Sequence, residues 1–201
     1  MPTPLPKPEI PEVECTTRAA WRAWLEQHHT AANGVWLITY RKAVADKYIA
    51  YADTVEEALC FGWVDSRPGK VDAERSKLYF TPRKPKSAWA KPNKIRIERL
   101  TAAGLMLPAG LKAVEIAKQN GTWTLLDDIE EYVCPPDLEA ALKKNKTART
   151  YFEAFPPGVR KTIYQWIILA KRPETRVKRI EETVALAGKN IRANQYRKPG
   201  E

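Results

Sequence analysis

Apolar positions near the start of the chain repeat with the spacing of an α-helix. The positions i, i+3, i+4 and i+7 are taken by Trp21, Trp24, Leu25 and His28. This spacing predicts a helix that begins after Thr16 or Thr17, runs to about residue 31 and packs one face on a core. An Asn33-Gly34 turn follows, and the β-branched and aromatic residues 35–40 then predict a strand.

Thr54 and Glu57 have the spacing of a capping box, in which two side chains bond backbone amides in the first turn of a helix. We therefore expect a short helix that begins at Thr54. Apolar and aromatic residues at 63–64 and 78–81 flank the tetrapeptide Arg67-Pro68-Gly69-Lys70. These residues predict a β-hairpin whose turn is that tetrapeptide.

Helical spacing predicts two more helices before Trp123 and only helices after it. The expected ranges are about 91–103, 109–119, 135–145, 147–155, 163–170 and 177–187. The fold class is therefore expected to be α+β, with a small, mostly antiparallel sheet and flanking helices, followed by an all-helical C-terminal region. The expected organisation is an extended proline-rich arm at 1–14, an α+β domain at 15–124, a helical region at 125–190 and a flexible tail at 191–201.

Composition favours a packed core and argues against several classes of site. Of the 201 residues, 44% are hydrophobic and 29% are charged, which are ordinary values for globular proteins. No apolar run approaches the ~18 residues of a membrane span, and the proline-rich N-terminus does not fit a secretory signal. Three widely spaced cysteines and two histidines argue against a disulfide framework or a zinc site. We therefore expect a cytoplasmic protein with no metal and no cofactor.

The net charge of +10 is distributed in blocks. Residues 66–99 hold eleven Lys and Arg against three acids, and residues 160–179 hold seven against one. Residues 122–142 hold six acids and no Lys or Arg. Basic blocks of this kind attract phosphates, nucleic acid or acidic partners. The alternative is that the acidic segment pairs with one of the basic blocks within the fold.

Aromatic and basic side chains interleave between residues 60 and 99, and this stretch holds the candidate ligand site. Its members are Trp63, Asp65, Arg83, Ser87, Trp89, Asn93 and Lys94. An aromatic ring stacks on a base while guanidinium and ammonium groups bind phosphate, so the set suits a nucleotide or single-stranded nucleic acid. The structural alternative is a solvated basic loop in which Trp63 and Trp89 belong to the core and Asp65 caps a turn.

Asp65 is the candidate catalytic residue. It would share one strand face with Trp63, where a desolvated carboxylate can act as an acid or a base. The sequence contains no nucleophile elbow, phosphate-binding loop or dinucleotide motif, which favours a protein that is not an enzyme. In the C-terminal region, Lys171, Arg176 and Arg179 form a candidate anion clamp. The alternative is that this clamp faces the acidic residues 127–131.

Several motifs resemble those of one bacterial protein family. They are Cys60-Phe61-Gly62-Trp63-Val64-Asp65-Ser66, Phe80-Thr81-Pro82-Arg83-Lys84, Ser87-Ala88-Trp89, Asn93-Lys94, Gly104-Leu105-Met106, Ala170-Lys171-Arg172-Pro173-Glu174-Thr175-Arg176 and Lys178-Arg179-Ile180. Over roughly residues 15–188 the chain resembles the YdeI or OmpD-associated (OmdA) family, whose members are often labelled bacteriocin-protection proteins. The resemblance implies a helical C-terminal region and a role in envelope stress or antimicrobial resistance. It implies no established reaction.

The function we expect is binding of an anionic ligand without catalysis, in a cleft between the α+β domain and the helical region. Trp63 and Trp89 would form its floor, and Arg83 and Lys94 would supply its charge. The ligand could be a small anion, a nucleotide or nucleic acid. One alternative is an enzyme that acts on a small anionic substrate through Asp65. Another is an interaction module whose C-terminal helices bind a protein partner.

Overall fold

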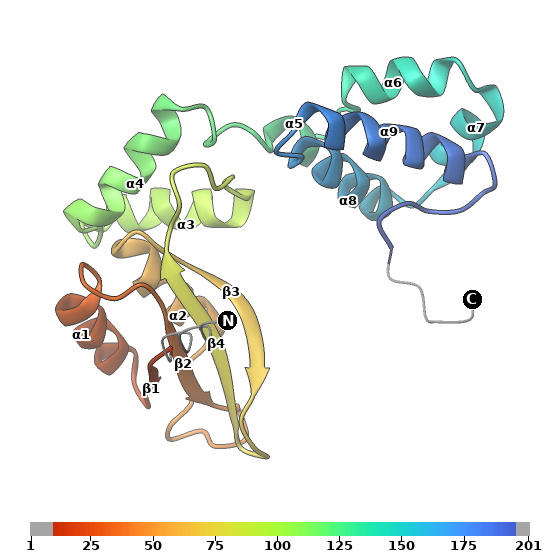
Figure 1. Ribbon diagram of the computed structural model, residues 1–201. Coiled ribbons are helices and arrows are strands. Elements are labelled where there is room, and N and C mark those ends of the chain that lie inside the picture. The colour runs from red at the N-terminus through yellow and green to blue at the C-terminus, as the bar shows by residue number, and fades with distance from the viewer. Residues whose placement is uncertain (1–9, 196–201) are drawn as a thin grey trace, which may run out of the picture. The chain divides into compact units, whose positions relative to one another are not determined.

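The computed structural model describes residues 10–195, which form two compact units that divide between Trp123 and Thr124 (Figure 1). The N-terminal unit combines a β-sheet with helices, and the C-terminal unit contains only helices among its described residues. The expected α+β class with a helical C-terminal region is therefore confirmed. Residues 1–9 of the expected arm and residues 196–201 of the expected tail lie outside the described residues.

The N-terminal unit is built on a mixed sheet. Its strands are β1 (Glu12–Glu14), β2 (Val35–Tyr40), β3 (Trp63–Lys70) and β4 (Arg75–Pro82). Their order across the sheet is β1-β2-β4-β3. Only the β1–β2 pair is parallel, so the sheet is mostly antiparallel as expected. The strand β1 comes from the end of the expected proline-rich arm. In this strand order, β1 and β3 are the two edges of the sheet.

The predicted hairpin exists, but its turn was wrongly placed. The tetrapeptide 67–70 belongs to β3, and the chain reverses at residues 71–74 instead. Asp72 organises this turn, because its Oδ1 accepts the backbone N–H of Glu74 at 2.9 Å and of Arg75 at 2.7 Å. Pro68 is tolerated within a strand because β3 is an edge strand and its register with β4 shifts between Asp65 and Pro68.

The helix α1 (Arg18–His28) begins at the expected cap. Thr17 Oγ1 accepts the N–H of Ala20 at 3.1 Å, and the helix ends at His28, three residues earlier than predicted. The prediction for α2 (Tyr51–Cys60) was wrong at its start, because this helix begins before Thr54 and no capping box forms.

The carboxylate that was expected to cap α2 joins it to α1 instead. Glu57 Oε1 accepts a hydrogen bond from Arg18 Nε at 2.6 Å, and Glu57 Oε2 accepts one from Arg22 at 2.8 Å. Glu56 is bonded by Arg99 of α3 (Lys91–Ala102). Both carboxylates are buried, so the guanidinium groups supply the hydrogen bonds that water would otherwise make. This ionic network ties three helices together.

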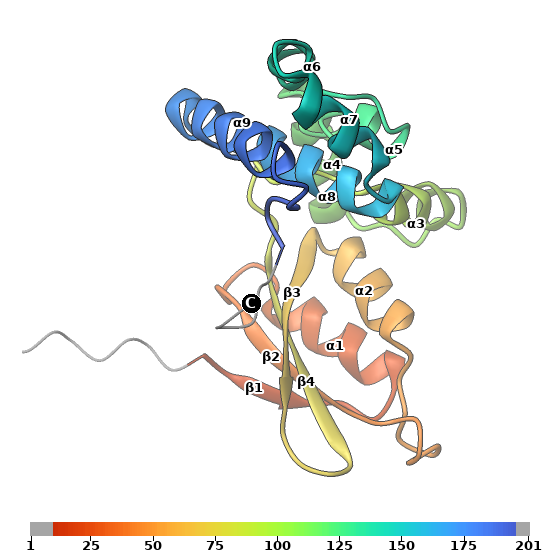
Figure 2. The same ribbon diagram turned by 90° about the vertical axis from the view of Figure 1, so that its right-hand side faces the viewer.

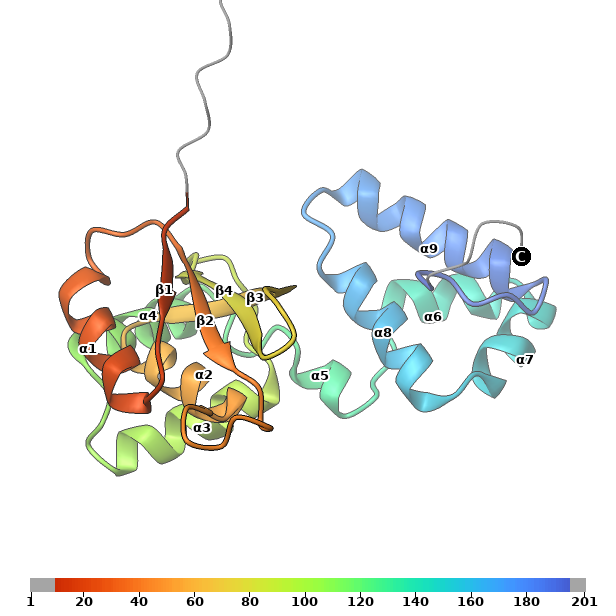
Figure 3. The same cartoon turned by 90° about the horizontal axis from the view of Figure 1, so that it is seen from below.

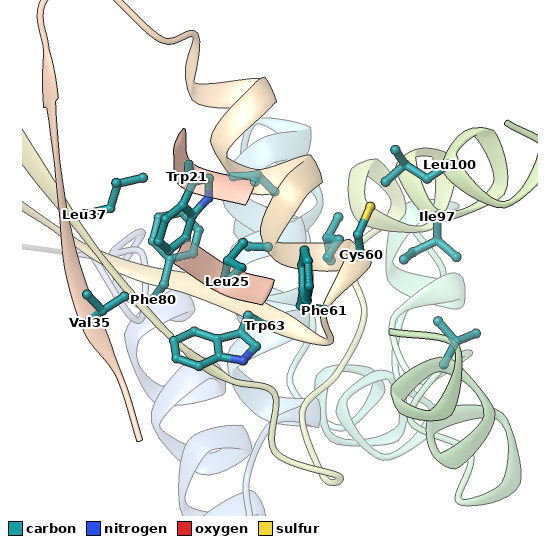
Figure 4. Packing of buried hydrophobic residues seen from close by; sticks show 14 of the residues in the cluster. Trp21, Leu25, Val35, Leu37, Cys60, Phe61, Trp63, Phe80, Ile97 and Leu100 are labelled. Carbon is teal, nitrogen blue, oxygen red and sulfur yellow. The ribbon is translucent and has the colours of Figure 1, made fainter. Parts of the chain in front are cut away.

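The core of the N-terminal unit lies between the sheet and the helices on one of its faces. Figure 2 shows α1 and α2 on that side of the sheet, and no helix of residues 10–123 covers the opposite face. Trp21 and Leu25 of α1 meet strand residues such as Phe80 (Figure 4). The helix α4 (Pro108–Gln119) approaches α2 closely at Gly110, where a Cβ would lie 2.4 Å from the carbonyl oxygen of Cys60. Glycine is therefore required at that contact.

The C-terminal unit is a bundle of short helices. They are α5 (Asp127–Glu130), α6 (Pro136–Lys143), α7 (Lys146–Ala154), α8 (Pro157–Ile168) and α9 (Pro173–Ala187). Figure 3 shows α9 lying along α6 and α8. Val177, which the apolar spacing placed on the inner face of α9, is 53% exposed, whereas Thr183 is buried and donates its hydroxyl to Arg179 O. None of the helices in residues 10–195 is long and apolar enough to cross a membrane.

Candidate functional site

The segment between β4 and α3 is organised around Arg83. The backbone N–H of Arg83 donates to Gly62 O at 2.9 Å, and its Nη2 donates to Ala88 O. The guanidinium carbon lies 3.7 Å from the ring centroid of Trp89, which is almost fully buried. A planar guanidinium stacked on an indole ring is held by both dispersion and the electrostatics of the ring face. The side chain of Arg83 is therefore fixed in orientation.

Two nitrogens of this guanidinium remain without a partner. Arg83 Nε and Nη1 are buried and make no hydrogen bond within the described part of the chain. Burial lowers the pKa of Arg83 to about 10, and the negative charge of Asp65 opposes this only in part. A buried donor without an acceptor costs about 1–3 kcal/mol, and more when it is charged. An anion bound beside the guanidinium would offset part of that cost through its charge.

Two hollows adjoin Arg83 and share Arg83, Lys84 and Pro85 as a common wall. The first, which we call the loop–helix hollow, has a volume of about 190 Å³. It is completed by Gly62, Trp89, Ala109, Lys112, Ala113 and Ile116. The second, the sheet-face hollow, has a volume of about 720 Å³. It is completed by Asn33, Ser66, Arg67, Tyr79, Thr81 and Pro82. Within residues 10–195, no Asp or Glu lines either hollow, whereas four cations line the two together.

The sheet-face hollow lies on the face of the sheet that α1 and α2 leave open. Trp36 and Tyr79 are direct neighbours across β2 and β4, and their ring centroids are 5.1 Å apart. The guanidinium carbon of Arg67 lies 4.8 Å from the Tyr79 ring centroid and 5.6 Å from that of Trp36. Tyr79 rests against Gly34, where a Cβ would lie 2.4 Å from Tyr79 Oη. This face therefore presents an aromatic pair beside an arginine.

The structure brings together only part of the candidate set from the sequence. Arg83 and Trp89 line the loop–helix hollow. The other members line neither hollow, and they are Trp63, Asp65, Ser87, Asn93 and Lys94. Trp63 is buried in the core, where its Nε1 donates to His29 O at 3.3 Å. The positions of Trp63 and Trp89 agree with the structural alternative, in which both rings belong to the core.

Three of the remaining polar candidates have partners of their own, and they are Asp65, Asn93 and Lys94. Asp65 accepts a hydrogen bond from Tyr51 Oη at 2.8 Å, and this bond, together with burial as the larger cause, raises the pKa of Tyr51. Asn93 Oδ1 accepts a hydrogen bond from Arg96 Nη1 at 2.9 Å. Lys94 is buried, and its Nζ lies 5.3 Å from the ring centroid of Trp123. Ser87 precedes Ala90, which is the N-cap of α3, so its hydroxyl does not cap that helix.

The C-terminal cluster makes contacts within its own unit. Arg176 binds Asp137 through two hydrogen bonds, Nε to Oδ2 at 2.6 Å and Nη2 to Oδ1 at 2.8 Å. Arg179 donates to Trp166 O, while Lys171 is exposed. The acidic segment 127–131 is reached by Lys161, whose Nζ lies 2.5 Å from Glu130 Oε2. Arg176 therefore joins α6 to α9 through Asp137, which lies outside the segment 127–131 that the structural alternative named as its partner.

Arg67, Tyr79, Asn33 and Lys112 line the hollows but were not in the candidate set. Arg67 was assigned to a turn, and its place in β3 follows from the register with β4, which the sequence does not show. The position of Lys112 in the loop–helix hollow follows from helical spacing, because Lys112 lies on the same side of α4 as Ala109, Ala113 and Ile116. Among the described residues, no group of three or more His, Cys, Asp or Glu side chains could hold a metal ion.

The fold and the site define a two-part protein, with an α+β unit that holds the candidate site and a helical unit that follows it in the chain. Residues 13–113 match a family model described as "Domain of unknown function (DUF8412)", and the chain belongs to this family. Residues 131–190 match the model described as "Bacteriocin-protection, YdeI or OmpD-Associated" (OmdA), which confirms the expected resemblance for the helical C-terminal region. The motifs between residues 60 and 106 lie within the other match. No curated protein and no solved structure matches the chain.

Proposed function

We propose that this protein is a non-enzymatic binding protein whose N-terminal unit holds an anionic ligand against Arg83. The observation that carries the proposal is the pair of buried Arg83 nitrogens, Nε and Nη1, that have no acceptor in the described structure. They belong to a side chain that lines two hollows free of carboxylates among the described residues. A phosphate or carboxylate group has the charge and the acceptor oxygens that this position lacks.

The surroundings of Arg83 support a preorganised site. The stack on Trp89 and the bond to Ala88 O hold the guanidinium in place before a ligand arrives. Lys84 and Lys112 are exposed and line the loop–helix hollow, so they can approach a second anionic oxygen. The partial desolvation of Arg83 strengthens its attraction for an anion, because the effective dielectric constant there is below that of water.

The geometry favours binding over acid–base catalysis. Asp65 lines neither of the hollows that Arg83 lines, and its carboxylate is bonded to Tyr51. For the biological setting, the bacteriocin-protection label of the OmdA model supports a role in stress or antimicrobial resistance. The cytoplasmic location expected from the sequence stays a prediction.

Pyrophosphate binding tests the site. At low ionic strength, and with sodium chloride at matched ionic strength as the reference, pyrophosphate should raise the Tm of the full chain by several degrees. A ligand at about 100 times its Kd stabilises the folded state by ~2.7 kcal/mol. The increment should shrink as salt screens the interaction. Arg83→Gln should abolish the increment, because it removes the charge and the guanidinium group while keeping a polar side chain.

Two further variants keep this test decisive. Lys112→Gln changes an exposed side chain of the hollow and should reduce the Tm increment without unfolding the protein. Lys86→Gln removes the same charge from an exposed position that lines neither hollow, and it should leave the increment unchanged. An increment that is as large in Arg83→Gln as in the wild type would overturn the proposal.

A further inference from the structure

The sheet-face hollow adds aromatic surface to the anion site. Tyr79 lies in this hollow beside Arg67, and Arg83 lies in its wall. Trp36 extends the aromatic surface from the neighbouring strand. Stacking surface and cations therefore occur within a single hollow, on a sheet face that no helix of residues 10–123 covers (Figure 2).

We propose that the anionic ligand is single-stranded nucleic acid, with a base stacked at Tyr79 and neighbouring phosphates against Arg67 and Arg83. This inference rests on the anion site proposed above and names its ligand class. Proteins that bind single strands without sequence preference combine a cationic groove with aromatic rings on which successive bases stack. The sheet-face hollow contains both components.

Arg67 is the adaptable member of the site. It is exposed, and within residues 10–195 it makes no ion pair, only its contacts with the Tyr79 and Trp36 rings. A guanidinium plane stacks on a base as well as on a side-chain ring. A base entering beside Tyr79 would therefore exchange one stacking partner of Arg67 for another, and the charge of Arg67 would stay next to the phosphate.

The charges on this sheet face set the path of a bound strand. Towards β1, Lys77 is paired with Glu12, and Arg75 is paired with Glu14 at 2.6 Å. Cations there are neutralised, and a polyanion would meet carboxylates. Towards the loop after β4, Arg83 and Lys84 form the wall shared with the loop–helix hollow, and Lys112 lies beyond it. The favourable path therefore runs from Tyr79 across Arg83 towards α4.

The shape of the site favours a strand over an isolated mononucleotide. Small-molecule sites enclose most of their ligand's surface. The sheet-face hollow instead has an exposed rim formed by Asn33, Ser66 and Lys84, and it adjoins a second hollow across the 83–85 wall. An extended chain can follow both hollows. A duplex would not offer the faces of its bases to Tyr79, because they are stacked within the helix.

Fluorescence anisotropy of the full chain with a labelled oligothymidylate tests this inference. A length of about ten nucleotides matches the usual footprint of a single-strand site. The oligonucleotide should bind, with an affinity that falls as salt rises. Tyr79→Leu should weaken binding about 10-fold, because it removes the ring and keeps an apolar side chain. Tyr40→Leu is the matched control, since Tyr40 lies on the same sheet face but lines neither hollow.

A second pair of variants separates the effect of where a positive charge lies from the effect of the protein's net charge. Arg67→Gln should weaken binding several-fold, whereas Lys77→Gln should not, although each removes one positive charge from the same sheet face. Equal losses in Tyr79→Leu and Tyr40→Leu, or in Arg67→Gln and Lys77→Gln, would overturn the inference. It would also be overturned if a duplex of the same length or thymidine monophosphate bound as tightly as the single strand.

The two proposals fail in different ways. If pyrophosphate stabilises the protein through Arg83 but the oligonucleotide does not bind, the anion site stands and the nucleic-acid inference is wrong. If pyrophosphate stabilises the wild type and Arg83→Gln equally, the anion site itself is wrong, and the inference falls with it.

Discussion

Arg83 differs from the other arginines of the N-terminal unit in what satisfies its guanidinium. Arg18 bonds Asp53, Glu56 and Glu57, and Arg22 bonds Glu57. The Arg83 guanidinium donates one hydrogen bond, to Ala88 O, and stacks on the Trp89 ring. Its other two nitrogens have no protein acceptor in residues 10–195. Carboxylate partners therefore mark Arg18 and Arg22 as structural arginines, whereas Arg83 has no carboxylate partner among the described residues.

Glu57→Gln tests the structural side of this distinction. The substitution leaves Arg18 and Arg22 with less negative charge at a buried position, so the free energy of unfolding should fall by about 1–3 kcal/mol. Denaturant unfolding measures the change. The control is Glu26→Gln, because Glu26 pairs with Arg22 on the exposed surface, and its loss should cost under about 0.5 kcal/mol. Equal costs for the two variants would contradict this account.

Periodicity predicted the helices and strands better than it predicted their ends. The repeat in α1 follows from local geometry, so both the helix and its Thr17 cap could be predicted. The capping box at Thr54 and Glu57 failed because Arg18, 39 residues away in the chain, uses the Glu57 carboxylate. The turn at 67–70 failed because the edge position of β3 makes Pro68 acceptable within a strand. Both errors reflect long-range partners.

The same limit applies to the candidate site. Arg83 and Trp89 lie six positions apart on one loop, so a local motif was enough to place them together. Tyr79 and Arg67 meet only through the register of β3 and β4. The burial of Trp63 depends on the packing of α1 against the sheet, which composition does not determine.

The contact between α6 and α9 makes the C-terminal unit sensitive to acid. The hydrogen bonds from Arg176 hold the pKa of Asp137 below its ordinary value of 3.8. A carboxylate with a lowered pKa stabilises the folded state above its unfolded pKa, and this contribution disappears as pH falls through the folded pKa. Wild type should therefore exceed Asp137→Asn in stability at pH 6 by at most about 1 kcal/mol, because the pair is partly exposed.

Circular dichroism during urea unfolding at several pH values measures this difference. The gap between the wild type and Asp137→Asn should close as the pH is lowered below about 4 and towards 2. Glu153→Gln serves as the control, because it removes the carboxylate of an exposed ion pair within α7. It should have little effect on the free energy of unfolding at pH 6 or at pH 2. A gap for Asp137→Asn that persists unchanged at pH 2 would show that the ion pair is not its cause.

At the scale of the whole molecule, the candidate site belongs entirely to one unit. The residues that line the two hollows lie between Asn33 and Ile116. The main core cluster is likewise formed by residues between Cys15 and Ala117, with Val13 and Trp123 packed at its margins. The N-terminal unit therefore contains both its own core and all the residues that line the two hollows.

A fragment of residues 10–123 should fold and keep the Tm increment from pyrophosphate, because neither property requires a side chain from the C-terminal unit. Differential scanning fluorimetry of this fragment beside residues 124–195 provides the comparison. The second fragment lacks Arg83 and should show no increment. A folded N-terminal fragment without the increment would show that the helical unit contributes to binding.

Pro68 has a consequence for how copies of this protein behave towards one another. An exposed edge strand offers unpaired amides that can recruit a strand from a second chain, which is the first step of sheet-mediated aggregation. β3 is such an edge, but Pro68 has no amide hydrogen and the register shift beside it interrupts the regular spacing of donors. The residue that misplaced the predicted turn therefore makes the β3 edge a poorer template for a strand from a second chain.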